Sequence, residues 1–208
     1  MSTVALLISF GLLASTGKIV NFDSDALGKT PSGWSVAMTN RGEVPRWEVR
    51  KDQTAPTQPY VLAQTSNDAT NDRCPLAIYN GMSLRDGDVS VRIKAVAGRA
   101  DQAGGLVWRY RDPNNYYFAR ENARTRTVAI FKMQNGERTQ MAVIPHDILP
   151  NTWSILKVSV RGNRFQVYVN HRRILQVDDK TFTGSGKVGL WTLADSVTYF
   201  DDFRVYPR

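Results

Sequence analysis

The feature that most constrains this fold is a succession of short strand-like runs separated by tight turns. Near the middle of the chain, two aromatic, arginine-bearing runs at Gly104–Arg111 and Tyr116–Arg120 flank the sequence Asp-Pro-Asn-Asn. Asp, Pro and Asn all favour turn conformations, so this stretch predicts a β-hairpin. Successive side chains of a strand point to opposite faces. We therefore expect one face with Leu106, Trp108 and Tyr110 and another with Val107, Arg109 and Arg111.

Similar signals recur before and after this hairpin. Gln134-Asn135-Gly136 separates two apolar runs, and Asn-Gly is a strong hairpin turn because both positions tolerate positive φ. The other expected strands are Trp34–Thr39, Arg46–Lys51, Tyr60–Gln64, Pro75–Tyr79, Asp88–Val96, Thr127–Met133, Arg138–Ile144, Trp153–Val160, Phe165–Val169, Ile174–Val177, Lys187–Thr192 and Val197–Tyr206. Many short strands without a convincing helix predict an all-β sandwich or barrel. No linker or fixed-period repeat divides the chain, so we expect one domain.

Composition is that of a folded, basic protein. The 208 residues include 42% hydrophobic and 22% charged residues, and the net charge is +8. Arginines are scattered, with Arg172-Arg173 as the one pair of adjacent arginines, whereas nucleic-acid binders concentrate charge on one stripe. We therefore expect no nucleic-acid partner. Acidic polysaccharide and an anionic membrane surface stay open as partners for this charge. With one cysteine, Cys74, no intramolecular disulfide can form, so the fold depends on its core.

The first residues carry an uncharged apolar run, Val4–Ala14, followed by small residues. The run is too short to span a bilayer, so we expect no membrane span. Its length and the residues after it are typical of a signal peptide, although no Lys or Arg precedes it. We interpret residues 1–16 as that signal and 17–208 as the mature domain, which predicts a periplasmic or extracellular protein. The alternative is an N-terminal strand or helix packed on the sandwich.

Several segments together resemble a known superfamily. They are Phe22-Asp23, Trp47-Glu48-Val49, Gly104-Gly105-Leu106-Val107-Trp108-Arg109, Gly186-Lys187-Val188-Gly189-Leu190-Trp191-Thr192 and the closing run from Asp195 to Phe203. From about Val20 onward the chain resembles the concanavalin A-like lectin/glucanase superfamily. Within it, the likeness is to bacterial laminin-G-like domains near the 3-keto-disaccharide hydrolase (DUF1080) family. The resemblance implies a two-sheet antiparallel jelly-roll sandwich, a fold that hosts lectins, glycosidases and inert modules.

The carboxylates do not follow the pattern of a glycosidase. Hydrolysis of a glycosidic bond needs two carboxyl groups on one face, and glucanases of the resembled fold carry Glu-x-Asp-x-Glu. That signature is absent, the glutamates are isolated, and Glu121 is expected to pair with an arginine. Of the two histidines, His146 lies in a loop and His171 in a turn beside two arginines, so a histidine–carboxylate metal cluster is not indicated. These observations favour a protein without catalysis.

The sequence thus predicts an exported carbohydrate-associated binding module whose partner is a poly- or oligosaccharide. Aromatic rings stack on sugar faces, and Arg and Asp bond directionally to hydroxyl groups. The candidate ligand-binding residues on the concave sheet are Arg109, Arg111, Tyr117, Arg120, Trp191 and Asp195. Two alternatives stay open: a glycoside hydrolase or lyase acting on a modified sugar, and a structural or adhesion module of the laminin-G-like kind. Oligomeric state is not specified by any of these patterns.

The resemblance also implies one structural calcium ion, which in that fold joins an N-terminal segment to the last strand. Calcium prefers carboxylate and carbonyl oxygens. The candidate ligands are Asp23, near the start, and Asp201 and Asp202, on the expected closing strand. The alternative is a network of these aspartates with surface arginines.

Overall fold

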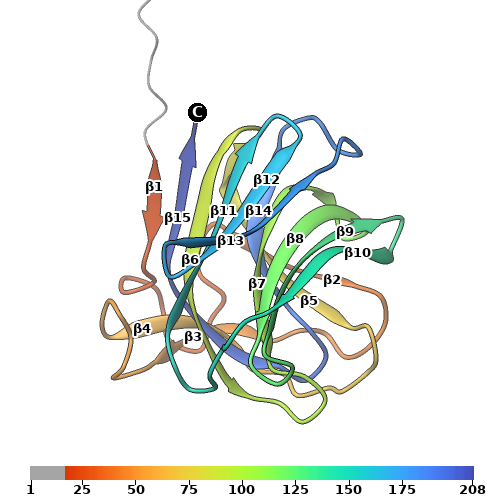
Figure 1. Ribbon diagram of the computed structural model, residues 1–208. Coiled ribbons are helices and arrows are strands. Elements are labelled where there is room, and N and C mark those ends of the chain that lie inside the picture. The colour runs from red at the N-terminus through yellow and green to blue at the C-terminus, as the bar shows by residue number, and fades with distance from the viewer. Residues whose placement is uncertain (1–16) are drawn as a thin grey trace, which may run out of the picture.

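The computed structural model describes residues 17–208 as two antiparallel β-sheets packed face to face (Figure 1). The described residues contain strands and no helix. In chain order the strands are β1 (Lys18–Val20), β2 (Trp34–Thr39), β3 (Trp47–Lys51), β4 (Tyr60–Gln64), β5 (Cys74–Leu84), β6 (Gly87–Ala97), β7 (Ala103–Asp112), β8 (Asn115–Asn122), β9 (Thr127–Gln134), β10 (Glu137–Pro145), β11 (Ser154–Arg161), β12 (Arg164–Val169), β13 (Arg172–Asp178), β14 (Gly186–Thr192) and β15 (Val197–Pro207).

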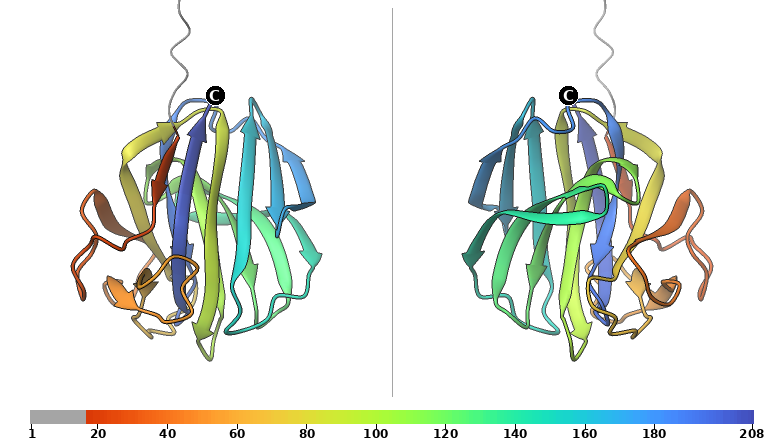
Figure 2. Two further views of the ribbon diagram at one scale, coloured as in Figure 1. Left: turned by 90° about the vertical axis from the view of Figure 1, so that its left-hand side faces the viewer. Right: turned by 90° about the vertical axis from the view of Figure 1, so that its right-hand side faces the viewer.

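The strand order defines the two layers. The eight-stranded sheet runs β13-β12-β11-β6-β15-β4-β3, with β1 added alongside part of β15. The seven-stranded sheet runs β10-β9-β8-β7-β14-β5-β2. The left view of Figure 2 shows the eight-stranded sheet from its outer side, with β15 between β1 and β6. This arrangement confirms the expected all-β, two-sheet jelly-roll sandwich.

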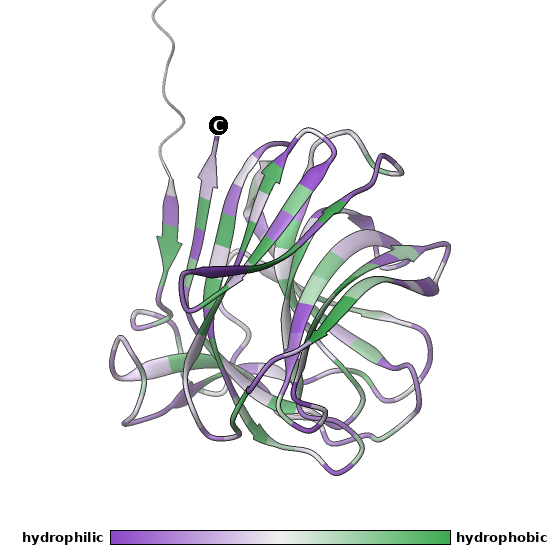
Figure 3. Cartoon of the chain, viewed as in Figure 1, coloured by the Kyte–Doolittle hydropathy of each residue, from purple (hydrophilic) through white to green (hydrophobic). Residues whose placement is uncertain are grey.

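The core lies between the two sheets. Trp108 and Tyr117 of the seven-stranded sheet stack at 5.7 Å, and both rings contact Phe165 from β12. At the other end, Trp34 packs edge-on against Phe203 of β15 at 5.0 Å. In Figure 3 the hydrophobic positions alternate with polar ones along many of these strands. The alternation of the sequence thus supplies one apolar face from each sheet.

Two bulges change the faces that simple alternation predicts. Arg109 has φ of +49° at the point where the β7–β8 register breaks. After this bulge Tyr110 lies on the outer face with Val107, although alternation predicts it on the inner face with Leu106 and Trp108. Asp202 has φ of +51° at a register shift on β15. An inserted residue shifts the pleat by one position. Strict alternation along 197–206 predicts Phe203 on the face of Asp201. That prediction is wrong, because Phe203 points into the core with Phe200.

Several boundaries match the sequence-based expectations and others differ. The expected strands at 34–39 and 60–64 have the observed bounds, whereas the short strand β1 was not expected. The apolar neighbours of Trp153 predict a core position for it, and this prediction is wrong: Trp153 is half-exposed and donates its indole N–H to the Thr54 hydroxyl at 3.2 Å. The signal-peptide interpretation concerns residues 1–16, which lie outside the described residues. Among residues 17–208 no helix is long and apolar enough to cross a membrane.

Candidate functional site

The outer face of the seven-stranded sheet carries a stack of aromatic rings. Phe118 of β8 lies between Trp191 of β14, at 4.4 Å, and Phe131 of β9, at 4.8 Å, with nearly parallel planes. Trp191 and Phe118 are fully buried, and Phe131 is 5% exposed. This stack therefore forms a second hydrophobic cluster, separate from the core between the sheets.

Two arginines hold their guanidinium groups over the last ring of the stack. The guanidinium carbon of Arg120 lies 5.5 Å from the Phe131 centroid, and that of Arg138 lies 5.7 Å from it. A guanidinium group over an aromatic face is attracted by the ring quadrupole. Arg120 also donates to the Thr127 hydroxyl at 3.1 Å. The cations thus cover Phe131 and bring positive charge to this end of the sheet.

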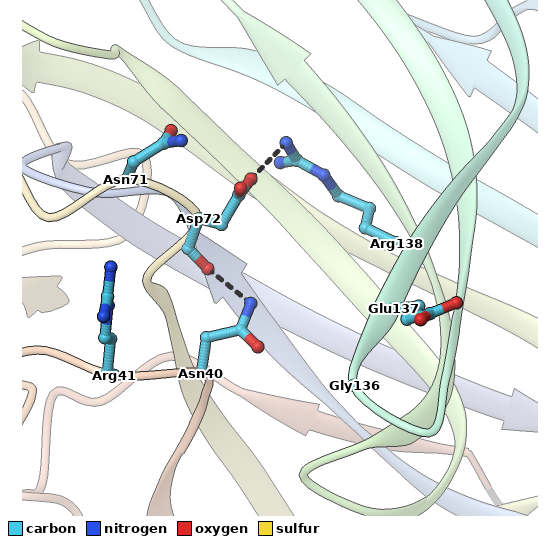
Figure 4. Close-up of a pocket in the computed structure, with 7 residues that line it drawn as sticks. All are labelled: Asn40, Arg41, Asn71, Asp72, Gly136, Glu137 and Arg138. Carbon is cyan, nitrogen blue, oxygen red and sulfur yellow. Dashed lines mark hydrogen bonds and ion pairs between the residues drawn. The ribbon is translucent and has the colours of Figure 1, made fainter.

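Beside Arg138 lies an open polar hollow of about 930 Å³, which we call the Arg138 pocket (Figure 4). Three separate segments line it: the loop after β2, the loop before β5, and the β9–β10 turn. The lining residues are Asn40, Arg41, Asn71, Asp72, Gly136, Glu137 and Arg138. Arg138 donates to the Asp72 carboxylate at 2.7 Å, and the Asn40 amide donates to the Asp72 carbonyl at 2.9 Å.

The loop that carries Asn71 and Asp72 is fixed by a buried arginine. Arg73 is fully buried and donates to the Glu43 carbonyl at 3.0 Å, the Ala194 carbonyl at 2.8 Å and the Ser66 hydroxyl at 2.7 Å. These bonds tie the loops on both sides of the pocket to the end of β14. Preorganised polar groups lose less conformational entropy on binding a ligand than mobile ones do.

The opposite wall is a tight turn. Asn135 and Gly136 have φ of +53° and +81°, which is the left-handed geometry that Asn and Gly tolerate. The turn places Glu137 and Arg138 at the start of β10, on the pocket rim. Within residues 17–208, Arg41 and Glu137 make no ion pair. Their charged groups are therefore available to a ligand.

Arg109 is a buried structural residue that binds loop carbonyls and is not available to a ligand. It is 1% exposed, and its guanidinium donates to the carbonyls of Phe182 at 2.7 Å, Gly162 at 2.6 Å and Arg85 at 3.0 Å. Burial lowers the pKa of this guanidinium, with the Asp86 carboxylate acting in the opposite direction. The bulge at this position turns the side chain away from the outer face. Arg109 therefore joins three loops at one end of the sandwich.

Three other expected ligand residues are also buried. Trp191 lies on the outer face, as alternation predicts, but has no exposed surface. Tyr117 points into the core, accepts a bond from the Phe182 N–H and donates to Asp179. Asp195 accepts N–H groups from the loop at Arg99, Ala100 and Asp101, and these bonds lower its pKa although burial opposes them. Tyr117 and Asp195 thus have hydrogen-bond partners within the fold, and Trp191 stacks on Phe118.

The remaining two residues reach the surface at different places. Arg111 is exposed and lies over the Phe182 ring at 4.8 Å, whereas Arg120 is half-buried over Phe131. The six residues therefore do not form one site. The sequence had indicated only the Asn135-Gly136 turn among the three segments that line the Arg138 pocket. These segments come together only in the folded chain, where the loop after β2, the loop before β5 and the β9–β10 turn lie next to one another.

The carboxylates that an enzyme would need are not brought together. Glu121 is 3% exposed and accepts a bond from the Ser154 hydroxyl, so the expected arginine partner is absent among the described residues. Burial raises its pKa to about 7. Asp195 binds a loop, and Asp112 accepts from its own turn at Asn114 and Asn115. Each carboxylate thus has a separate local role.

The aspartates considered for calcium also have separate partners. Asp23 accepts the Tyr60 N–H at 3.1 Å, and Asp201 accepts the N–H and hydroxyl of Thr57. Asp202 pairs with Arg92 at 3.0 Å and with Arg204 at 3.3 Å. In the described part of the chain no group of three or more His, Cys, Asp and Glu side chains could hold a metal ion. The arginines beside Asp202 do not fit a cation site.

The layers and their connections define a two-sheet antiparallel jelly-roll domain. No protein-family model matches the chain. Among curated proteins, the levanase of Bacillus subtilis is 33% identical over 101 residues, which are 48% of this chain and 14% of that enzyme. The chain therefore corresponds to a small part of the levanase it matches.

Solved structures agree on the fold. The carbohydrate-binding module CBM66 of Bacillus subtilis superposes with a TM-score of 0.66 at 22% identity, covering 83% of this chain and 94% of the module. A GH16 protein of Bacteroides ovatus in complex with a glucan product gives a TM-score of 0.63 at 10% identity, covering 90% and 99%. The β-glucanase of Bacillus licheniformis gives 0.61 at 11% identity, covering 92% and 98%. Binding modules and glucanases thus share this architecture.

Proposed function

We propose that this protein is a carbohydrate-binding module without catalysis of its own, and that the Arg138 pocket is its sugar site. The observation that carries the proposal is the set of planar polar groups around one hollow: the Arg138–Asp72 pair, Arg41 and the amides of Asn40 and Asn71. Such groups make directional hydrogen bonds to neighbouring hydroxyls. Because Phe131 is covered, sugar binding there depends on hydrogen bonds rather than on ring stacking.

The first polysaccharide to test is levan. Its choice follows from the levanase match and from the likeness to a carbohydrate-binding module. The apolar run at 4–14 supports an exported protein that meets polysaccharide outside the cytoplasm. Hydrolysis receives no support from the separated carboxylates Glu121, Asp195 and Asp112.

The test is calorimetric titration of the protein with levan oligosaccharides, alongside mixed-linkage glucan. Arg138→Ala removes the guanidinium that anchors the pocket, and Asp72→Ala removes its partner. We expect each substitution to weaken binding by at least about tenfold, since a lost charged hydrogen bond is worth about 1.5–3 kcal/mol. Arg138→Lys keeps the charge but not the planar fork, so it should restore little.

The matched control is Arg164→Ala, which breaks another arginine–aspartate pair, Arg164–Asp178, on the other sheet at 3.3 Å. It should leave levan affinity within about twofold, because exposed pairs contribute little to the fold. Equal weakening by Arg138→Ala and Arg164→Ala would place the sugar elsewhere. Absence of binding to either polysaccharide by the unmodified protein would overturn the proposed function.

A further inference from the structure

The outer face of the eight-stranded sheet carries a row of cations that the sequence leaves scattered. Strand register sets Arg204 of β15 opposite Ser90 of β6, Ser90 opposite Lys157 of β11, and Lys157 opposite Tyr168 of β12. Tyr168 in turn is opposite Arg173 of β13. Neighbouring strands lie about 4.8 Å apart, so this basic row crosses five strands over about 19 Å.

The cations of the basic row keep free hydrogen-bonding groups. Within residues 17–208, Lys157 and Arg173 make no ion pair, and the Lys157 ammonium lies 4.2 Å from the Tyr168 ring centroid. Arg204 engages Asp202 through one terminal nitrogen, which leaves its other N–H groups unused. Its side chain is 39% exposed. The row therefore presents hydrogen-bond donors to solvent that are not used in ion pairs within the protein.

Next to the row lies a small hollow of about 140 Å³ that is shaped by two arginines. Arg92 and Arg204 both contact the Oδ2 atom of the Asp202 carboxylate. The rest of the lining is Ser90, Val91, Ile155 and His171. Arg92 uses its Nε for Asp202 at 3.0 Å, so its terminal nitrogens stay available. A hollow of this size takes one carboxylate or sulfate group.

The acidic side chains facing this surface are already neutralised. Asp202 pairs with Arg92 and Arg204, Asp88 with Arg161 and Arg208, and Asp178 with Arg164. The net charge of this surface is about +3, from the four cations Arg92, Lys157, Arg173 and Arg204 and the one carboxylate Asp202. A concentrated field of one sign attracts a polymer of the opposite sign.

We propose that the basic row binds an acidic polysaccharide, one that carries carboxylate or sulfate groups along a linear chain. The hydroxyls of Ser90 and Tyr168 between the cations suit sugar hydroxyls. Single-stranded nucleic acid requires open ring faces for base stacking, and Lys157 occupies a face of Tyr168. The site is independent of the Arg138 pocket, because the two lie on different sheets of the sandwich.

The experiment is affinity measurement on the whole chain with polygalacturonate and with dextran sulfate, at about 20 mM and about 300 mM salt. Neutral dextran, a single-stranded DNA and anionic lipid vesicles are measured in parallel. The test variant is Lys157→Gln with Arg204→Gln. Its control is Arg99→Gln with Arg124→Gln, which removes the same charge from exposed loops at Arg99 and Arg124.

We expect the test variant to lose at least about tenfold in affinity for one of the two acidic polymers at low salt, and the control less than about twofold. Levan binding should be unchanged in both. Polygalacturonate and dextran sulfate separate carboxylate from sulfate recognition. Lys157→Gln with Arg173→Gln, which leaves the Asp202 pairs intact, supplies a second variant if the first unfolds.

Equal losses in both variants would show a net-charge effect and overturn the proposal. Tighter binding of the DNA or of the vesicles than of either polysaccharide would overturn it as well. Because levan is measured on the same samples, failure of the basic row and failure of the Arg138 pocket give different results.

Discussion

The outer faces of the two sheets differ although both arise from the same alternation of side chains. On the seven-stranded sheet, rings pack on rings, and Arg120 and Arg138 lie over the last of them. On the eight-stranded sheet, Arg204, Lys157 and their neighbours stay in contact with water. Alternation therefore determines which residues share a face, whereas loops and long side chains determine whether that face is open.

The largest expected effect concerns the covered face. Trp191→Ala removes a fully buried ring that stacks on Phe118 at 4.4 Å. We expect the free energy of unfolding, measured by urea denaturation, to fall by about 3–5 kcal/mol. On the other sheet, Tyr206 is 42% exposed, and Tyr206→Ala should cost less than about 1 kcal/mol. Similar losses for the two substitutions would contradict the difference between the faces.

A second prediction separates framework arginines from surface arginines on β7. Arg109→Ala leaves the carbonyls of Phe182, Gly162 and Arg85 without their donor, so unfolding free energy should fall by about 3 kcal/mol. Levan affinity per folded molecule should not change. Arg111→Ala, at an exposed position, should cost less than about 1 kcal/mol. If Arg109→Ala lost sugar affinity but kept its stability, Arg109 would be a ligand-binding residue, as the sequence predicted.

The third prediction compares one buried carboxyl group from each sheet. Burial raises the pKa of Glu121 to about 7, and that of Asp201 to about 6 despite bonds from Thr57 and Asp202. In the unfolded chain both ionise near pH 4. Between about pH 4 and 7 the unfolded state therefore releases protons that the folded state retains, so stability falls as pH rises.

We expect the Glu121→Gln variant to remove on the order of 2 kcal/mol of this fall between pH 5 and pH 8. The Asp201→Asn variant should remove less, because the Asp201 pKa is raised less. Thermal unfolding across that pH range checks both. A pH profile of Glu121→Gln that matches the unmodified protein would show that Glu121 is ionised in the folded state.

The strands were predictable because their signals are local. Asn135-Gly136 fixes a turn by backbone preference alone, and the apolar alternation of β6 identifies its buried face without knowledge of the rest. The bulge at Arg109 was not predictable, because the left-handed conformation there depends on carbonyls from three distant loops. Because of this bulge, Tyr110 and Arg109 lie on other faces of the sheet than alternation predicts.

The candidate sites were less predictable than the strands because their parts are far apart in the chain. Asp72 and Arg138 meet only when the loop before β5 reaches the β9–β10 turn. The basic row needs the register of four strand pairs to bring Arg204 to the line of Lys157 and Arg173. Trp191 was placed on the correct face, but its burial depends on neighbours such as Phe118 that sequence spacing does not reveal.

The pairing of β1 with β15 has a mechanical consequence. Lys18 lies opposite Val205, so Gly17 and Arg208 leave the sheet from adjacent antiparallel strands at the same end (Figure 1). Tension applied between these two points would act across the β1–β15 hydrogen bonds and break them one after another, starting at the Lys18–Val205 end. It would not load all of them at once in shear. A domain held by these ends would thus release β1 at low force while the remaining strands of the sheet stay paired.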